Sequence, residues 1–240
     1  MAIELPSEVA QLLQFIGINW PQVNEDKVRE FGGHVRDFAA NIQDTHDQAS
    51  STLKALGQAY QGHSYELLAS KWAHLSQGHM SLLIDACHVL ATALEAAADF
   101  IIGMKVECIA ELVVMAAAFV ADQAAAVATF GAAEAALALI EEAAEKAVDF
   151  LTQQLVQHII GEVIEAALKP LLGLIDKAVS GMTYSALEDM LGVSGGAAGT
   201  GFGIDADAVM QHAQLFRGHA ETVAGHAQTL TAAVSGLSFS

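Results

Sequence analysis

The sequence is poor in cysteine and in basic residues. Only two cysteines, Cys87 and Cys108, occur in 240 residues, which excludes a disulfide framework and a tetrahedral thiolate metal site. On one straight helix they would lie roughly 30 Å apart, too far for a bridge. We therefore expect both to be small core residues.

Basic residues number 10 against 28 acidic ones, which gives a formal net charge of −18. A chain this acidic repels phosphate backbones and anionic lipid surfaces, so nucleic-acid binding is not expected. The segment from Met1 to Pro6 lacks both a basic region and a long apolar core, and it does not form a classical secretory signal. Export would need another route.

Catalytic signatures are also missing. The sequence contains no nucleophile elbow, no phosphate loop and no paired zinc-ligand spacing. We therefore expect no enzymatic activity, no cofactor and no metal ion.

Two long amphipathic segments flank a short turn that contains a glycine. The first carries apolar or small residues at helical spacing: Val28, Phe31, Val35, Phe38, Ile42, Thr45, Ala49 and Leu56. The second carries a similar stripe, with one gap at His79: Tyr65, Leu68, Trp72, Leu75, Leu82, Ala86, Val89, Ala93, Ala97 and Phe100. Each stripe marks one helix face, and two such helices joined by a short turn fold as an antiparallel hairpin.

Capping signals set the expected ends of these helices. Asn24 opens the first hairpin helix and Gly57 stops it, while the second helix continues to Gly103. A short helix precedes the hairpin, with Ser7 as its N-cap and Gly17 at its end.

The remaining chain also favours helices. Alanine supplies 16 of the 32 residues from 116 to 147, and alanine promotes closely packed helices. A further helix is expected at about 132–168 and a last one at about 205–233. The fold predicted is all-α: a long antiparallel hairpin extended by alanine-rich helices into an elongated bundle, plus a C-terminal helix.

The expected domains are a helical bundle over residues 1–191, a glycine-rich linker over 192–203, and a C-terminal helix with its tail over 204–240. The linker prediction rests on the glycines and small residues that follow Ser194.

Three histidines recur every seven residues in the last helix: His212, His219 and His226. Seven residues make two turns, about 10 Å, so the three rings cannot share one metal ion. The spacing predicts a polar stripe along a helix–helix seam, and such a stripe would be sensitive to pH.

Residues 112–131 have about the length of a membrane-spanning helix, ~20 residues. Asp122 lies inside this stretch, and an acid near the bilayer centre costs roughly 3 kcal/mol. A closely packed core helix is the main interpretation, and membrane insertion or pore formation is the alternative.

The turn Tyr60-Gln61-Gly62, followed by Tyr65 and Trp72, resembles the Trp-Xaa-Gly hairpin of type VII secretion substrates. In that family the turn joins two antiparallel helices, and further aromatic residues follow it. Tyr60 stands where tryptophan is usual. Its ring is expected to pack across the hairpin tip, while Gly62 permits the tight backbone.

Residues 1–180 more specifically resemble the N-terminal WXG-like module of actinobacterial polymorphic toxins. The resemblance is carried by Asn19-Trp20-Pro21, by the segment from Glu25 to Arg29, and by the segment from Ala121 to Glu134. In those proteins a variable toxin follows the module. No toxin domain is recognisable here, so we expect a stand-alone delivery or partner protein, or the leading part of a longer one.

The same secretion systems recognise a Tyr-Xaa-Xaa-Xaa-Asp/Glu signal after a helical hairpin, and Tyr184 and Glu188 match it. Residues four apart share a helix face, although an ordinary short amphipathic helix also fits so brief a pattern. The resemblance implies a non-enzymatic secretion substrate or targeting module, exported from the cytoplasm by the type VII route. Its expected partners are the secretion machinery and either a helical protein or a second copy. A self-assembling structural protein is the other alternative.

Overall fold

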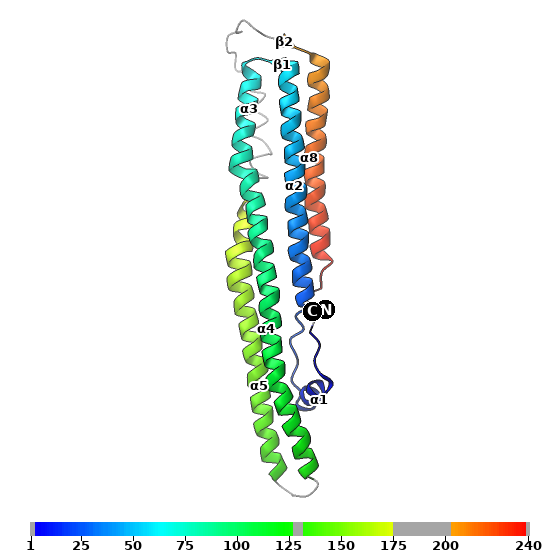
Figure 1. Ribbon diagram of the computed structural model, residues 1–240, viewed down its shortest axis with the longest axis vertical. Coiled ribbons are helices and arrows are strands. Elements are labelled where there is room, and N and C mark those ends of the chain that lie inside the picture. Colours follow the sequence, from blue (N-terminus) through cyan, green and yellow to red (C-terminus); the bar gives the residue numbers. More distant parts are fainter. Residues whose placement is uncertain (1–2, 127–131, 175–202, 239–240) are drawn as a thin grey trace. The chain divides into compact units, whose positions relative to one another are not determined.

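The computed structural model describes residues 3–126, 132–174 and 203–238. Within these ranges the protein is all-α, as predicted, apart from two strands of two residues each (Figure 1). The elements run in this order: α1 (Ser7–Ile16), α2 (Glu25–Ala59), β1 (Tyr60–Gln61), α3 (His63–Leu75), the π-helical turn η1 (Ser76–Met80), α4 (Ser81–Ala126), α5 (Ala132–His158), the π-helical segment η2 (Ile159–Leu168), β2 (Gly203–Ile204) and α8 (Ala206–Ser235).

The chain divides into two compact units. Unit 1 contains Met1–Glu30, Ala93–Ile164 and Ser238–Ser240, and unit 2 contains Phe31–Thr92 and Glu165–Leu237. The domain boundaries expected at residues 191 and 203 fall on or next to residues outside the described ranges. They stay predictions.

Local chemistry explains where the first two helices end and begin. Gly17 ends α1 with φ 75° and ψ 20°, a left-handed conformation that glycine adopts without steric cost. The Asn24 side chain accepts a hydrogen bond from the Lys27 amide at 3.1 Å, which confirms the predicted cap of α2. Ser7 is not the N-cap that we expected. It is the first helical residue, and its hydroxyl donates to Glu8 while Pro6 precedes the helix.

The first predicted stripe forms the buried face of α2. All of its members are buried except Phe31, which is half-buried, and Leu53 joins them. Gly57 does not stop the helix, because α2 continues to Ala59.

The second predicted stripe is correct only as far as η1. In this turn the Ser81 amide donates to the carbonyl of Ser76, five residues back, so the turn holds one residue more than an α-helical turn. Most of the buried positions that follow are therefore one residue later than predicted, while Ala97 is buried as predicted. Leu82 and Val89 are exposed, and the core is made by Met80, Leu83, Cys87, Leu90, Leu94 and Ile101.

Helix α4 continues through Gly103, which we had expected to stop it. Cys87 and Cys108 both lie on this helix and are buried, as predicted. Burial raises the pKa of each thiol to about 11, and for Cys108 the nearby Glu111 carboxylate adds to the effect.

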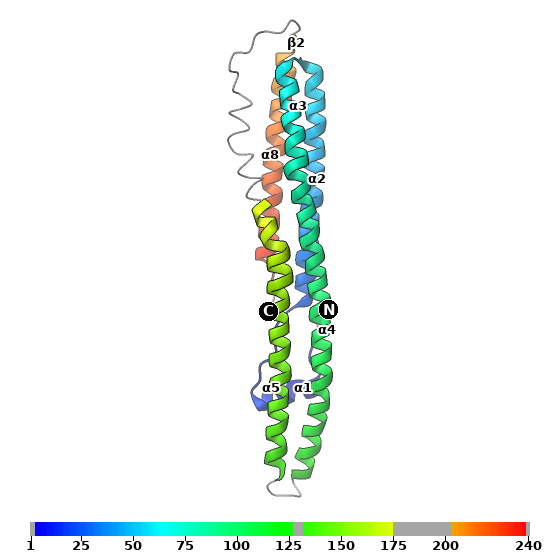
Figure 2. The same cartoon turned by 90° about the vertical axis from the view of Figure 1, so that its left-hand side faces the viewer.

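Within unit 1, α4 and α5 lie side by side (Figures 1 and 2). The core face of α5 is formed by Ala144, Val148, Leu151 and Leu155, which are buried. Phe100 stacks on His158 with the ring centres 4.0 Å apart. The core of α1 is Val9, Leu12 and Leu13, and Phe15 of the same helix contacts Phe119.

Candidate functional site

The tip of the hairpin is a tight turn closed by two backbone hydrogen bonds. Gly62, with φ 158° and ψ 170°, lies in a backbone region that is essentially restricted to glycine. Its carbonyl accepts hydrogen bonds from the amides of Tyr65 and Glu66, which start α3. The half-buried Tyr60 precedes it on β1.

A distant segment completes this tip. β1 pairs antiparallel with β2, with Tyr60 opposite Ile204 and Gln61 opposite Gly203. The Asp205 amide then donates to the carbonyl of Ala59 at 2.9 Å, and the Asp205 side chain caps α8 by accepting from the Ala208 amide. The turn between α2 and α3 is therefore bonded to the start of the last helix.

Tyr65 folds back from α3 onto α2. Its hydroxyl donates to the Leu53 carbonyl at 3.3 Å, and its ring occupies the space beside Gly57. A Cβ added at Gly57 would lie 2.4 Å from the ring and from the hydroxyl oxygen. Gly57 thus provides space for the tyrosine.

Trp72, about two helical turns after Tyr65, is the centre of an aromatic and polar cluster. The indole N–H donates to Ser50 Oγ at 2.9 Å. One ring face stacks on His46 at 5.1 Å, and Phe216 of α8 meets the indole edge-on at 5.8 Å. The cluster therefore joins α2, α3 and α8.

His46 is held in this cluster as a buried ring. Its Nε2 lies 2.6 Å from Ser76 Oγ, and its buried Nδ1 has no hydrogen-bond partner among the residues that the structure describes. Burial lowers the pKa of His46, and the nearby Asp47 carboxylate opposes this only in part. A ring in this environment favours the neutral form.

The predicted histidine stripe lies on a helix–helix seam within unit 2, where α8 runs alongside α2 (Figure 1). His226 Nε2 is 3.1 Å from Thr45 Oγ1, and His219 Nε2 is 3.1 Å from Thr52 Oγ1. The seven-residue spacing of the histidines is matched by the seven-residue spacing of the threonines. The contact therefore repeats every two turns along two antiparallel helices.

Hydrogen bonding fixes the direction of these contacts. Each threonine hydroxyl already donates its proton to a carbonyl four residues back, Thr45 to Asn41 and Thr52 to Gln48. Its oxygen must then accept from the histidine, so His219 and His226 each carry a proton on Nε2. His212, the third member, has a buried Nδ1 that finds no partner among the described residues.

The structure describes four of the six site residues that the sequence predicts. The structure places Tyr60 and Gly62 in the hairpin turn, Tyr65 at the start of α3 and Trp72 in the third turn of that helix. Tyr184 and Glu188 lie outside the described residues, so the candidate signal stays a prediction. Sequence reasoning missed His46 and Ser50 and gave Gly57 a different role, because each of the three gets its role from a residue on α3. The apolar spacing identifies only the core-facing side of each helix, and it does not predict contacts made by the other residues.

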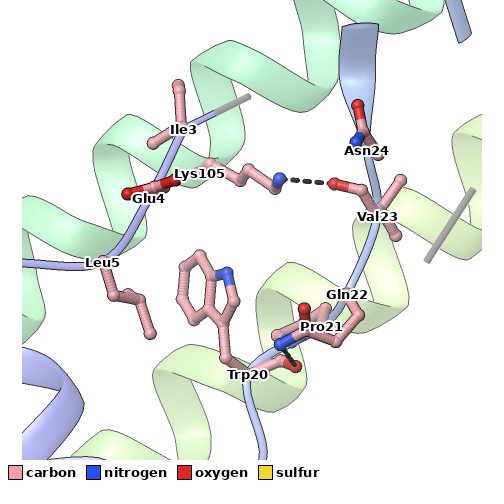
Figure 3. A pocket seen from close by; sticks show the side chains of 9 residues that line it. All are labelled: Ile3, Glu4, Leu5, Trp20, Pro21, Gln22, Val23, Asn24 and Lys105. Atoms are coloured by element: carbon pink, nitrogen blue, oxygen red, sulfur yellow. Dashed lines mark hydrogen bonds between the residues drawn. The ribbon is translucent and has the colours of Figure 1, made fainter. Parts of the chain in front are cut away.

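Unit 1 contains a pocket of about 250 Å³ lined by Ile3, Glu4, Leu5, Trp20, Pro21, Gln22, Val23, Asn24 and Lys105. Figure 3 shows the Trp20 indole pointing into it, with Lys105 reaching across to the carbonyl of Val23.

A buried ion pair adjoins this pocket. Lys105 Nζ lies 2.7 Å from Glu25 Oε2, and both side chains are at most 3% exposed. The Ile3 amide donates to the same carboxylate. Burial acts to raise the pKa of Glu25, but the hydrogen bonds from Lys105 and Ile3 outweigh it and leave that pKa below its ordinary value.

Metal-binding clusters and membrane-spanning helices are both missing from the described ranges. No group of three or more His, Cys, Asp or Glu side chains there is arranged to hold a metal ion. Among the helices formed by these residues, none combines the length and the apolar character needed to cross a membrane.

A family model described as "WXG100 like domain" matches residues 2–160 of the chain. The match takes in α1 to α5 with the hairpin turn, and it ends before α8. No curated protein and no solved structure matches the chain.

Proposed function

The chain belongs to the WXG100-like family, a family of type VII secretion substrates, and we propose that it is itself a non-enzymatic substrate of such a system or the targeting module of one. The observation that carries the proposal is the family match over the segment that forms the hairpin and its Tyr60-Gln61-Gly62 turn.

We propose further that the protein acts by association between helices. The hairpin already accepts a third helix, α8, of which no residue is fully buried. Histidine–threonine bonds and the contact between Phe216 and Trp72 hold that helix. Helix faces that accommodate one helix in this way suit recognition of another amphipathic helix. The partners proposed are the secretion machinery and a small helical protein.

Export is the direct test. The full chain would be expressed in an actinobacterial host with an intact type VII ATPase and in the same host without it, and the culture medium would be blotted. We expect the protein in the medium only when the ATPase is present. Retention inside the cell in both hosts would contradict the proposal, and the family relationship would then concern the fold alone.

Single substitutions test the proposed signal at Tyr184 and Glu188 separately from the export experiment. Tyr184→Ala and Glu188→Ala should each reduce export at least about tenfold if these side chains form one recognition patch. Ser185→Ala changes an unspecified position of the same pattern and should leave export unchanged. Equal export of all three variants would show that another segment is recognised.

A further inference from the structure

The stripe by which α8 contacts the hairpin has a histidine at every second position. Within unit 2, α8 runs beside α2 (Figure 1), and its half-buried residues include a stripe with alternating spacings of three and four: Val209, His212, Phe216, His219, Val223, His226 and Leu230. No residue of α8 is fully buried. A helix held by partly buried side chains alone is released more easily than one anchored in a core.

Two of these histidines are paired and one is not. His219 and His226 each donate to a threonine of α2, and the two threonines lie seven residues apart. The next position of that repeat is Ala59, which has no hydroxyl group. His212 continues the histidine repeat toward the start of α8, and its buried Nδ1 has no hydrogen-bond partner among the described residues.

A second unpaired ring nitrogen belongs to the cluster that α8 completes. His46 of α2 stacks on Trp72, and Phe216 of α8 meets the same indole edge-on. Nδ1 of His46 is buried without a partner in the described part of the chain, and the one other histidine nitrogen in this condition there is Nε2 of His158, in unit 1. Within the described part of unit 2, the buried unpaired nitrogens are therefore those of His46 and His212.

The protonation state of these two rings depends on whether the buried nitrogen reaches water. A neutral imidazole carries one N–H and can leave its other nitrogen bare, whereas the charged ring carries an N–H on both. A buried N–H without an acceptor is costly, and burial of the positive charge adds to that cost. Burial accordingly lowers the pKa of His46, and the Asp47 carboxylate opposes this only in part. While α8 is docked, both rings are therefore favoured in the neutral form.

No carboxylate of the described residues supplies the missing acceptor. Every carboxylate of unit 2 within the described ranges is exposed: Asp37, Asp44, Asp47, Glu66, Asp85, Glu165, Asp205, Asp207 and Glu221. The cations of the same unit are exposed as well, apart from the half-buried Arg36: Lys54, Lys71, Lys169 and Arg217. The other histidines of this unit are half-buried at 34 and 79 and exposed at 63, 74 and 88. A proton added to Nδ1 of His46 or His212 therefore meets neither an acceptor nor a buried counter-charge.

We propose that α8 is an acid-released helix, which docks on the hairpin at neutral pH and lifts off it as the pH falls below about 6.5, where exposed histidine takes up a proton. His46 and His212 respond, because release opens their buried nitrogens to water. The released state binds more protons than the docked state, so a fall in pH favours release. His219 and His226 set the register of the helix. Charging leaves their Nε2–H bonds to threonine in place, so they do not drive release. The proposal rests on contacts within unit 2 and does not depend on the route of export.

Hydrogen–deuterium exchange of the full chain at about pH 7.5 and about pH 5.5, on either side of the histidine range, tests the proposal. Each rate is divided by the intrinsic rate at the same pH. A histidine that stays neutral when docked and titrates near pH 6.5 when released weakens docking about tenfold at the lower pH. Two such histidines should lower the protection factors of α8, residues 206–235, about a hundredfold. Protection of residues 31–59 in α2 should change less than about threefold, because its buried face stays packed.

Variants identify the responding groups. His212→Phe and His46→Phe should each reduce the pH response of α8 to about tenfold, and the double variant should abolish it. Each variant is compared with itself at the two pH values, so one that holds α8 less tightly still gives a ratio. The matched control is His158→Phe, which replaces a histidine with a buried unpaired nitrogen in unit 1 and should keep the full response. His226→Ala removes a threonine bond and should lower protection at both pH values without changing their ratio.

Four results would overturn the proposal. Equal protection of α8 at both pH values would show that acid does not release it. A joint loss of protection over α2 and α8 would show that unit 2 unfolds as a whole. A full pH response in the double variant would have another source. A response abolished by His226→Ala would make the paired histidines the groups that respond.

Discussion

Tyr65 can lie against α2 because the residue beneath it has no side chain. Gly57 sits one turn from the Leu53 carbonyl that accepts the tyrosine hydroxyl, and the phenol ring fills the space where a Cβ would project. Glycine inside a helix costs up to about 1 kcal/mol relative to alanine. At Gly57 this cost is offset by the packing of the first aromatic residue after the hairpin turn.

Gly57→Ala should therefore destabilise the protein although alanine is the better helix former. The new methyl group would lie 2.4 Å from the ring, so the tyrosine must move and its hydrogen bond to Leu53 is lost. We expect the free energy of unfolding to fall by about 1–3 kcal/mol in urea titrations. Gly33→Ala lies on the same helix, where the added Cβ meets nothing within 4 Å, and it should stabilise by up to about 1 kcal/mol. Equal effects of the two substitutions would show that Tyr65 does not depend on Gly57.

At the scale of elements, η1 determines which residues of the second hairpin helix face the core after residue 80. Upstream, Tyr65, Leu68, Trp72 and Leu75 follow α-helical spacing, and all are half-buried. Downstream the same spacing resumes from Met80 instead of from residue 79. The single extra residue rotates the downstream apolar stripe by one position, about 100° around the helix.

Deleting His79 should convert this π turn into a regular α-helical turn. The buried residues from Met80 onward would then continue the upstream stripe without interruption. We expect the free energy of unfolding to change by less than about 1 kcal/mol, with helical content by far-UV circular dichroism retained.

The control deletes Ala40, an exposed residue in the middle of α2, a helix without a π turn. There the deletion rotates Ile42, Ala49 and Leu56 away from the core. The free energy of unfolding should therefore fall by more than about 4 kcal/mol. If the His79 deletion is as harmful as the Ala40 deletion, the π turn does not act as a one-residue insertion.

These elements also show how far sequence reasoning reaches. The stripe on α2 was predicted almost residue by residue, because an uninterrupted α-helix repeats at 3.6 residues and core packing follows that repeat. The stripe on α4 was shifted by one residue. Its cause was visible only as the gap at His79, because apolar spacing does not distinguish a π turn from a polar interruption. The contacts around Trp72 and the pairing of β1 with β2 join residues far apart in sequence, and no local pattern encodes them.

At the scale of the whole molecule, the two units are stabilised by different chemistry. Unit 1 contains the buried pair of Glu25 and Lys105, and a buried pair destabilises strongly when one partner is removed. Unit 2 depends on the Trp72 cluster and on the histidine–threonine seam. A perturbation of one unit should therefore reach the other only weakly.

Lys105→Met tests this in the full chain by hydrogen–deuterium exchange. The substitution leaves the Glu25 carboxylate buried without its cation, so we expect unit 1 to lose about 3–5 kcal/mol of stability. Exchange should accelerate over residues 93–126 and 132–158, while residues 31–75 stay protected. The control is Lys146→Met, which removes the exposed pair with Glu142 in the same unit and should cost less than about 1 kcal/mol. Equal acceleration in both units would mean that they unfold together, because a cooperative molecule transmits the loss of one ion pair to every helix alike.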